Sequence, residues 1–177
     1  LFCQSHFSFL SAAASPEQLV CTADSLGYQA LALTDECSVA GVVRAHRQIK
    51  QQQLKIRLIV GSYFRYAADL RLLLLCPDRK AYAELCRIIS NCRRRADKGQ
   101  YRLEEWDLKS CRDCLVLWLP SAIPASDQHW GAWLKRQFGS RLYLAQQRVL
   151  DACDYDYQQH CQQLSHKFEL PACAVGA

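Results

Sequence analysis

Two short segments hold side chains that could do chemistry together. Asp35 and Glu36 follow an apolar run at residues 30–34, and carboxylates are ligands that divalent metal ions prefer. Cys111 and Cys114 form a Cys-x-x-Cys pair, which is typical of zinc sites. A structural zinc ion needs four ligands, usually from two such pairs, and the sequence contains no second one. A single Cys-x-x-Cys motif is more often a pair of buried thiols than a metal site, so the role of these two cysteines stays open.

The densest positive charge lies at residues 93–95, with Lys98 and Arg102 close behind. Because this run ends a predicted helix, where the helix dipole favours cations, we interpret it as a solvated helix end. Contact with nucleic-acid phosphates is the alternative, although no aromatic residues are interleaved for base stacking. The net charge of +5 is compatible with a nucleic-acid-handling protein but does not establish one.

Length and composition predict one globular domain over residues 1–177. Half of the 177 residues are apolar, which is enough to bury a core. The chain opens with Leu1 and contains no Met, so we expect it to be a piece of a longer protein. Its first apolar run lacks a basic lead-in, and no run reaches the length of a membrane span. We therefore expect a cytoplasmic protein without membrane contact.

The seven predicted strands alternate with helices. The expected strands are residues 1–5, 30–34, 56–64, 70–76, 114–119, 142–146 and 172–175. The expected helices are residues 16–26, 38–53, 81–95, 126–138 and 155–168. This alternation favours parallel strands with crossover helices, and six or seven such units favour a distorted or incomplete parallel (β/α) barrel. Because working groups follow the carboxyl ends of barrel strands, Asp35 and Tyr63 are expected to be neighbours at one rim.

Residues 33–46 resemble the threonine-aspartate-histidine segment of PHP (polymerase and histidinol phosphatase) domains. The Glu-Cys variant at residues 36–37 is similar to the error-prone branch of bacterial C-family DNA polymerases, the translesion relatives of the polymerase III alpha subunit. Further similar segments follow in the same order. They are residues 7–10, 27–33, 60–65, 82–89, 98–103 and 117–120. The resemblance spans nearly the whole chain and implies a barrel of PHP type.

Active PHP domains bind several divalent metal ions and use metal-bound water to cleave phosphate esters. The resemblance places the family's His-x-His motif on Phe2 and Gln4, although Phe has no lone pair and an amide is a poor substitute for imidazole. Its Gly-x-Glu motif ends here on Tyr63, a neutral and weak ligand. The degenerate metal-site positions are Phe2, Gln4, Asp35, Glu36, Cys37 and Tyr63.

At the second motif Asp35 is kept, Glu36 replaces the usual His, and Cys37 replaces an acidic residue. Residues 174–177 approach the family's last Asp-x-His pair, but the sequence ends before it. The histidines elsewhere are expected to be solvated or locally hydrogen-bonded rather than relocated ligands. They are His6, His129, His160 and His166. We expect no catalytic residue and no bound metal in this domain.

The resemblance implies a non-catalytic structural and interaction domain of a DNA-directed DNA polymerase, a nucleotidyltransferase. Such a parent acts in translesion synthesis, DNA repair and damage-induced mutagenesis, with magnesium in a palm domain outside this chain. Its implied partners are DNA, the sliding clamp and translesion accessory proteins, whose contact surfaces cannot be assigned. One alternative is a metal-dependent phosphoesterase or 3'-5' exonuclease around Asp35 and Glu36. Another is a free-standing PHP-like protein with a binding role.

The cysteine content gives a first test. The eleven cysteines are an odd number, and no secretion signal accompanies them, so a disulfide framework is not expected. We expect most thiols to react with Ellman's reagent when the chain is denatured without reductant. Several protected disulfides in that titration would contradict the assignment to a reducing compartment.

Overall fold

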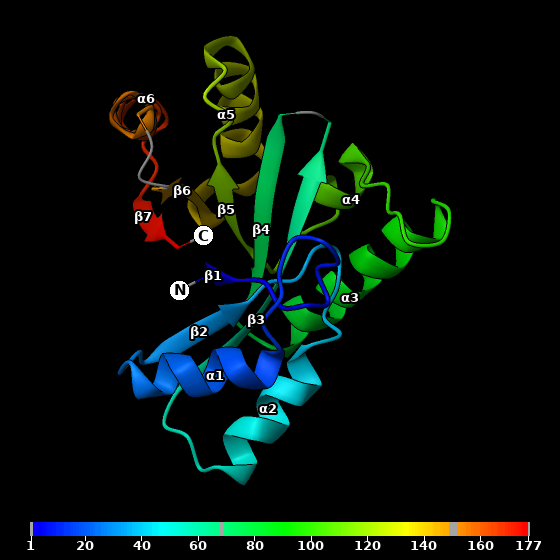
Figure 1. Ribbon diagram of the computed structural model, residues 1–177. Coiled ribbons are helices and arrows are strands. Elements are labelled where there is room, and N and C mark those ends of the chain that lie inside the picture. Colours follow the sequence, from blue (N-terminus) through cyan, green and yellow to red (C-terminus); the bar gives the residue numbers. More distant parts are fainter. Residues whose placement is uncertain (1, 68, 149–151, 177) are drawn as a thin grey trace.

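The computed structural model describes residues 2–67, 69–148 and 152–176, and its strands form one sheet that follows the order of the sequence (Figure 1). The strands are β1 (Phe2–Cys3), β2 (Ala30–Leu33), β3 (Arg57–Tyr66), β4 (Leu70–Cys76), β5 (Leu115–Leu119), β6 (Leu142–Gln147) and β7 (Ala172–Val175). The helices are α1 (Pro16–Ser25), α2 (Val42–Gln51), α3 (Arg79–Arg94), α4 (Glu105–Lys109), α5 (Pro124–Phe138) and α6 (Asp154–Phe168), with a 3₁₀ turn η1 (Gly139–Arg141).

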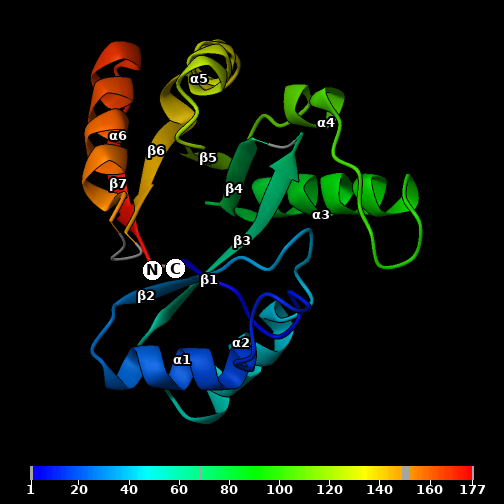
Figure 2. The same ribbon diagram turned by 45° about the horizontal axis from the view of Figure 1, so that its top comes forward.

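The sheet is curled into half of a barrel, with the helices on its outer side (Figure 2). The strands β1 to β3 are parallel, and so are β5 to β7, but β4 is antiparallel to both of its neighbours. The predicted α/β class and incomplete barrel are confirmed, whereas parallel pairing throughout is wrong at β4. Only three residues separate β3 from β4, which is too short for the crossover that a parallel pair requires.

Buried leucines cover both faces of β4. Leu72 and Leu74 belong to the main core, which fills the space between the sheet and the helices α3 to α6. Leu73 points the other way and packs on the concave face with Phe2, Tyr63 and residues of β5 to β7. A smaller core lies between α1, α2 and β2. Each fully buried leucine contributes about 1.5–3 kcal/mol to the free energy of unfolding.

Most predicted elements are present, with shifted ends. The bounds of β4 and β7 are confirmed, and the described first strand is Phe2–Cys3, with Leu1 outside the described residues. The helix α2 begins at Val42 rather than at residue 38, because Cys37 has a positive φ of 45° and the chain turns before entering the helix. The short helix α4 was not predicted. No helix in the described part of the chain is long and apolar enough to cross a membrane.

The carboxyl ends of the first three strands lie side by side. Leu33 pairs with both Cys3 and Val60 in register, and beyond the strands Glu36 forms an isolated bridge with Tyr63. The amide of Tyr63 donates to the carbonyl of Asp35 at 3.2 Å. The predicted proximity of Asp35 and Tyr63 is therefore confirmed.

At Gly61 the backbone of β3 lies very close to β4 and to Thr34. A Cβ atom there would lie 2.6 Å from Leu75 Cδ2, 2.8 Å from the Leu74 carbonyl oxygen and 2.9 Å from Thr34 Cγ2. We expect Gly61→Ala to lower the free energy of unfolding by about 1–3 kcal/mol, measured by urea denaturation. The control Arg57→Ala, at an exposed position of the same strand, should change it by less than about 0.5 kcal/mol. Equal stability of the two variants would contradict this account of the packing.

Candidate functional site

A cavity of about 500 Å³ lies at the carboxyl ends of β1 to β3. Four of the predicted metal-site positions line it, namely Phe2, Gln4, Glu36 and Tyr63. Two arginines, Arg65 and Arg71, line it as well. The structure thus brings most of the predicted positions together, while Asp35 and Cys37 are buried behind the cavity wall, each 1% exposed.

Aromatic rings occupy two positions where the resemblance implies ligands. The rings of Phe2 and Tyr63 are stacked, with their centroids 6.4 Å apart. Both belong to the apolar cluster on the concave face that includes Leu73, Leu119 and Val175. Burial raises the pKa of Tyr63, so its hydroxyl stays neutral and remains a weak ligand. This part of the cavity fits apolar packing rather than metal coordination.

Asp35 is retained, but its carboxylate is already bound within the protein. Its Oδ1 accepts hydrogen bonds from the Ser5 amide at 2.6 Å and from Ser8 Oγ at 2.7 Å. Its Oδ2 accepts from Ser5 Oγ at 2.8 Å. A buried carboxylate needs such donors to offset its lost hydration. Because these serines follow β1, Asp35 fastens the loop after β1 to the end of β2.

Glu36 faces the cavity and is held by an arginine. Arg65 donates Nε to Oε1 at 2.9 Å and a terminal nitrogen to Oε2 at 3.0 Å, in a bidentate pair. Tyr101 donates its hydroxyl to Oε1 at 2.9 Å. The hydrogen bond between Arg65 and Glu36 raises the pKa of Arg65, and burial raises the pKa of Tyr101. Both side chains therefore stay protonated and act as donors. The negative charge that a metal ion would neutralise is therefore already paired.

Cys37 does not face the cavity but belongs to the main core. Its amide donates to the Tyr63 carbonyl at 2.9 Å. Its hydrogen bond with Cys92, despite its burial, lowers the pKa of Cys37 from the usual value of a thiol. The side chain consequently couples the rim to α3 and is not placed to ligate an ion in the cavity.

The donor set as a whole fits a metal cluster poorly. Among the residues that line this cavity in the described chain, Glu36 is the only carboxylate and none is a histidine. Arg71 adds a second fixed positive charge and donates to the Pro120 carbonyl. Sequence reasoning missed Arg65, Arg71 and Tyr101. A basic residue following the Gly-x-Tyr segment was the available signal for Arg65, but its partner lies 29 positions away.

The remaining histidines are engaged elsewhere or lie outside this cavity. The Nε2 atom of His160 lies 2.8 Å from a carboxylate oxygen of Asp127, which is fully buried. The ring of His129 packs edge-on against Trp130. His6 Nδ1 lies 3.4 Å from the Ala14 carbonyl. The contacts of His6 and His160, and the exposed position of His129, agree with the prediction of solvated or locally hydrogen-bonded histidines.

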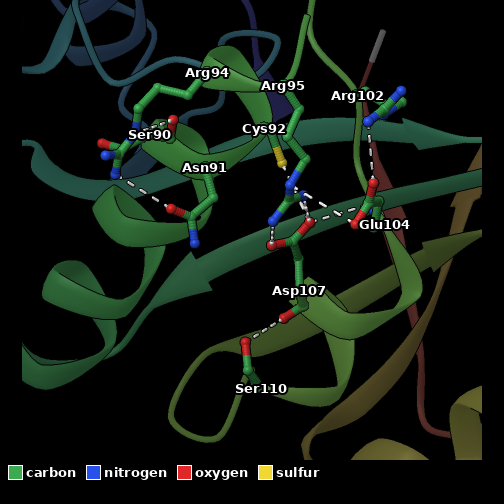
Figure 3. Close-up of polar contacts among 9 residues, drawn as sticks. All are labelled: Ser90, Asn91, Cys92, Arg94, Arg95, Arg102, Glu104, Asp107 and Ser110. Atoms are coloured by element: carbon green, nitrogen blue, oxygen red, sulfur yellow. Dashed lines mark hydrogen bonds and ion pairs between the residues drawn. The ribbon is translucent and has the colours of Figure 1, made fainter.

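Two of the three arginines at residues 93–95 are bound to the protein. Arg93 donates to the carbonyls of Glu36 and Cys37 at 3.0 and 3.2 Å. Arg95 forms a bidentate pair with the buried Asp107, as Figure 3 shows. Arg94 is exposed, and it donates hydrogen bonds to the Ser90 carbonyl and the Asn91 side chain within its own helix (Figure 3). The interpretation as a solvated run therefore holds for Arg94 and is wrong for its two neighbours.

This difference can be measured. Arg95→Ala would leave Asp107 buried without its cation, and we expect a loss of about 2–4 kcal/mol in the free energy of unfolding. The matched control Arg94→Ala, one residue away, should change it by less than about 0.5 kcal/mol. Thermal or urea denaturation of both variants gives the comparison. Similar losses in the two would refute the structural role assigned to Arg95.

Residues 1–119 match the family description "PHP domain". Among curated proteins, the error-prone DNA polymerase of Vibrio vulnificus (strain YJ016) is 54% identical over 176 residues, which are 99% of this chain and 17% of that protein. The error-prone DNA polymerase of Alkalilimnicola ehrlichii is 46% identical over 177 residues, again 17% of its length. The chain therefore spans about a sixth of the length of these relatives.

Two solved structures share the fold. One is described as a putative metal-dependent phosphoesterase from Bifidobacterium adolescentis, with a TM-score of 0.67 and 12% identity, covering 98% of this chain and 84% of its own. The other is an amidohydrolase from Chromobacterium violaceum with bound sulfate and no metal, with a TM-score of 0.65 and 10% identity, covering 99% and 85%. The match to the family description, the architecture and the placement of the motif positions agree, and this chain belongs to the PHP domain family.

Proposed function

We propose that this chain is the N-terminal PHP domain of an error-prone DNA polymerase, and that the domain has a structural and interaction role rather than a catalytic one. The observation that supports the non-catalytic role is that both acids of the second motif, the retained Asp35 and the substituted Glu36, are already bound by the protein. Asp35 is bound by Ser5 and Ser8, and Glu36 by Arg65 and Tyr101. The similarity to error-prone DNA polymerases along 99% of the chain supports the first half.

The proposal extends to the parent protein of this domain. We propose that the parent polymerase copies damaged DNA in translesion synthesis, repair and damage-induced mutagenesis, using magnesium in a palm domain beyond this chain. Its partners are DNA, the sliding clamp and translesion accessory proteins in the cytoplasm. The reading frame past Ala177 provides a direct test. A frame that ends there would leave a free-standing PHP-like protein instead.

A metal-dependent phosphoesterase or 3'-5' exonuclease is the second candidate. The architecture shared with the structure described as a metal-dependent phosphoesterase is consistent with it, but that likeness shows the fold alone and does not favour it. The ligand count opposes it. A multi-metal centre needs several carboxylate or imidazole donors, whereas the side chains that line this cavity offer as ligands one paired carboxylate and otherwise only neutral groups, namely two amides, a hydroxyl, a phenol and a thiol.

Manganese separates the two candidates, because it prefers oxygen and nitrogen donors over thiolates. We expect the purified chain, equilibrated with Mn²⁺ and then desalted, to retain no stoichiometric manganese in elemental analysis. We also expect no hydrolysis of a phosphodiester substrate above the level of a matched Asp35→Ala preparation. Retained manganese together with hydrolysis that Asp35→Ala abolishes would overturn the non-catalytic assignment.

A gain-of-binding variant provides the positive control. Phe2→His, Gln4→His and Tyr63→Glu together restore three of the family's ligand types. We expect this triple variant to bind Mn²⁺ measurably but weakly, because Arg65 and Arg71 stay in the cavity. It should also be less stable, since aromatic bulk is removed from the concave face. Unchanged manganese binding would show that the cavity is not the relic of a metal site.

A further inference from the structure

A cluster of sulfur and carboxylate ligands lies away from the PHP cavity, beneath the first half of α3. Cys111 and Cys114 meet Glu84 there, and one ligand atom from each lies within 4.8 Å of the others. Among residues 2–67, 69–148 and 152–176, these three side chains form the group of potential metal ligands whose atoms lie close enough together to share one ion. Both thiols are 0% exposed and Glu84 is 8% exposed. The Cys-x-x-Cys pair, which has no second cysteine pair in the sequence, therefore gains a third potential ligand in Glu84, 27 residues before Cys111.

The backbone around the two cysteines is held by charged side chains of opposite sign. Glu84 accepts hydrogen bonds from the amides of Arg112, Asp113 and Cys114 at 2.6, 2.9 and 3.3 Å. Arg141 donates to the carbonyls of Cys114 and Cys111 at 2.8 and 3.3 Å. The loop is consequently fixed on both sides before any ligand arrives. Little ordering is left for a bound ion to impose, which favours binding.

The separations suit a tetrahedral ion with sulfur ligands. Zinc binds thiolate sulfur at about 2.3 Å and carboxylate oxygen at about 2.0–2.2 Å, so neighbouring ligand atoms lie about 3.5–4 Å apart. The observed atoms need only contract slightly to reach those distances. An ionised carboxylate offers about four lone-pair sites, so Glu84 can bind an ion and still accept its amide bonds. Cys76 interacts with Cys114 through its side chain but lies outside this group of three, so it would have to move toward Cys111 and Glu84 to become the fourth ligand.

We propose that Cys111, Cys114 and Glu84, with Cys76 as the fourth donor, form a structural site for a thiophilic divalent cation, for which zinc fits best. Cys111, Cys114 and Glu84 are buried and Cys76 is half-buried, so the site has no opening for substrate, and its role is to join α3, the end of β4 and the loop before β5. Its paired cysteines distinguish it from the PHP cavity, where Cys3 is a single thiol among oxygen and nitrogen groups. The inference stands whether or not the proposed polymerase role is correct.

Proton release is a consequence of this chemistry. The mutual hydrogen bond and burial raise the pKa of Cys111, and although the bond to Cys111 lowers the pKa of Cys114, contact with Cys76 and burial raise it further. Zinc binds the thiolate form, so each thiol that coordinates the ion gives up its proton when the ion binds.

The test uses the 177-residue chain expressed with added zinc, desalted and treated with a mild chelator. We expect about one zinc ion per chain to remain in elemental analysis. Cobalt exchanged into the site should give the near-ultraviolet sulfur-to-cobalt charge-transfer band of thiolate ligation. Cys111→Ser and Cys114→Ser should lose the zinc and the band. The control Cys161→Ser changes an equally buried cysteine in α6 and should keep both.

Zinc loss in Asp35→Ala, with retention in the cysteine variants, would place the ion in the PHP cavity and overturn this inference. Chains that hold no zinc, or that recover a Cys111–Cys114 disulfide under native conditions, would overturn it too. Should the cysteine variants fail to fold, X-ray absorption at the zinc edge of the unaltered chain decides. Two or three sulfur ligands support the proposal, and a shell without sulfur refutes it.

Discussion

The rim of the half-barrel depends on the burial of one carboxylate. Asp35 is 1% exposed, and a charge removed from water in this way is tolerated only with several donors around it. Ser5 and Ser8 supply three hydrogen bonds, and Ser8 Oγ in turn accepts the amide of Glu36 at 3.0 Å. Ser62 Oγ donates to the Asp35 carbonyl at 2.8 Å. The ends of β1, β2 and β3 therefore meet around one residue.

At this rim, arginine side chains supply the positive charge that metal ions would otherwise supply. In an active PHP site, divalent cations neutralise the carboxylates and bring them together. Here Arg65 neutralises Glu36, while the guanidinium of Arg93 gathers the carbonyls of Glu36 and Cys37. An arginine cannot dissociate or exchange ligands as a bound metal ion can. The rim can thus keep its geometry without a cofactor, in agreement with the structural role proposed for the domain.

The sequence predicted elements better than their directions or partners. The strand β4 could be located from its leucine run, but buried strands of either direction read as continuous apolar runs. The short connection before Leu70 was the usable sign of a hairpin. The five-residue helix α4 is too short to show helical periodicity. The pairs Glu36 with Tyr101 and Glu84 with Cys114 span 65 and 30 positions, and one sequence does not encode such pairings visibly.

We expect no metal ion in the PHP cavity but propose one at Cys111, Cys114 and Glu84. Hydrogen bonding accounts for this difference between the two sites. At the rim, oxygen ligands are bound by serine, tyrosine and arginine donors, each of which an incoming ion would have to displace. Beneath α3, the thiols of Cys111 and Cys114 hydrogen-bond with each other, Cys111 also bonds to the Glu84 carboxylate, and Cys114 contacts Cys76 and the Ala81 carbonyl, the latter at 3.5 Å. A thiol gives up little in such contacts, since it hydrogen-bonds weakly. Displacement costs are therefore higher at the inherited positions, where an ion would have to remove a guanidinium from Glu36, than at the sulfur cluster, where the three backbone amides bound by Glu84 can stay in place. This holds even though the inherited motif, and not the lone cysteine pair, is the one that resembles a known metal centre.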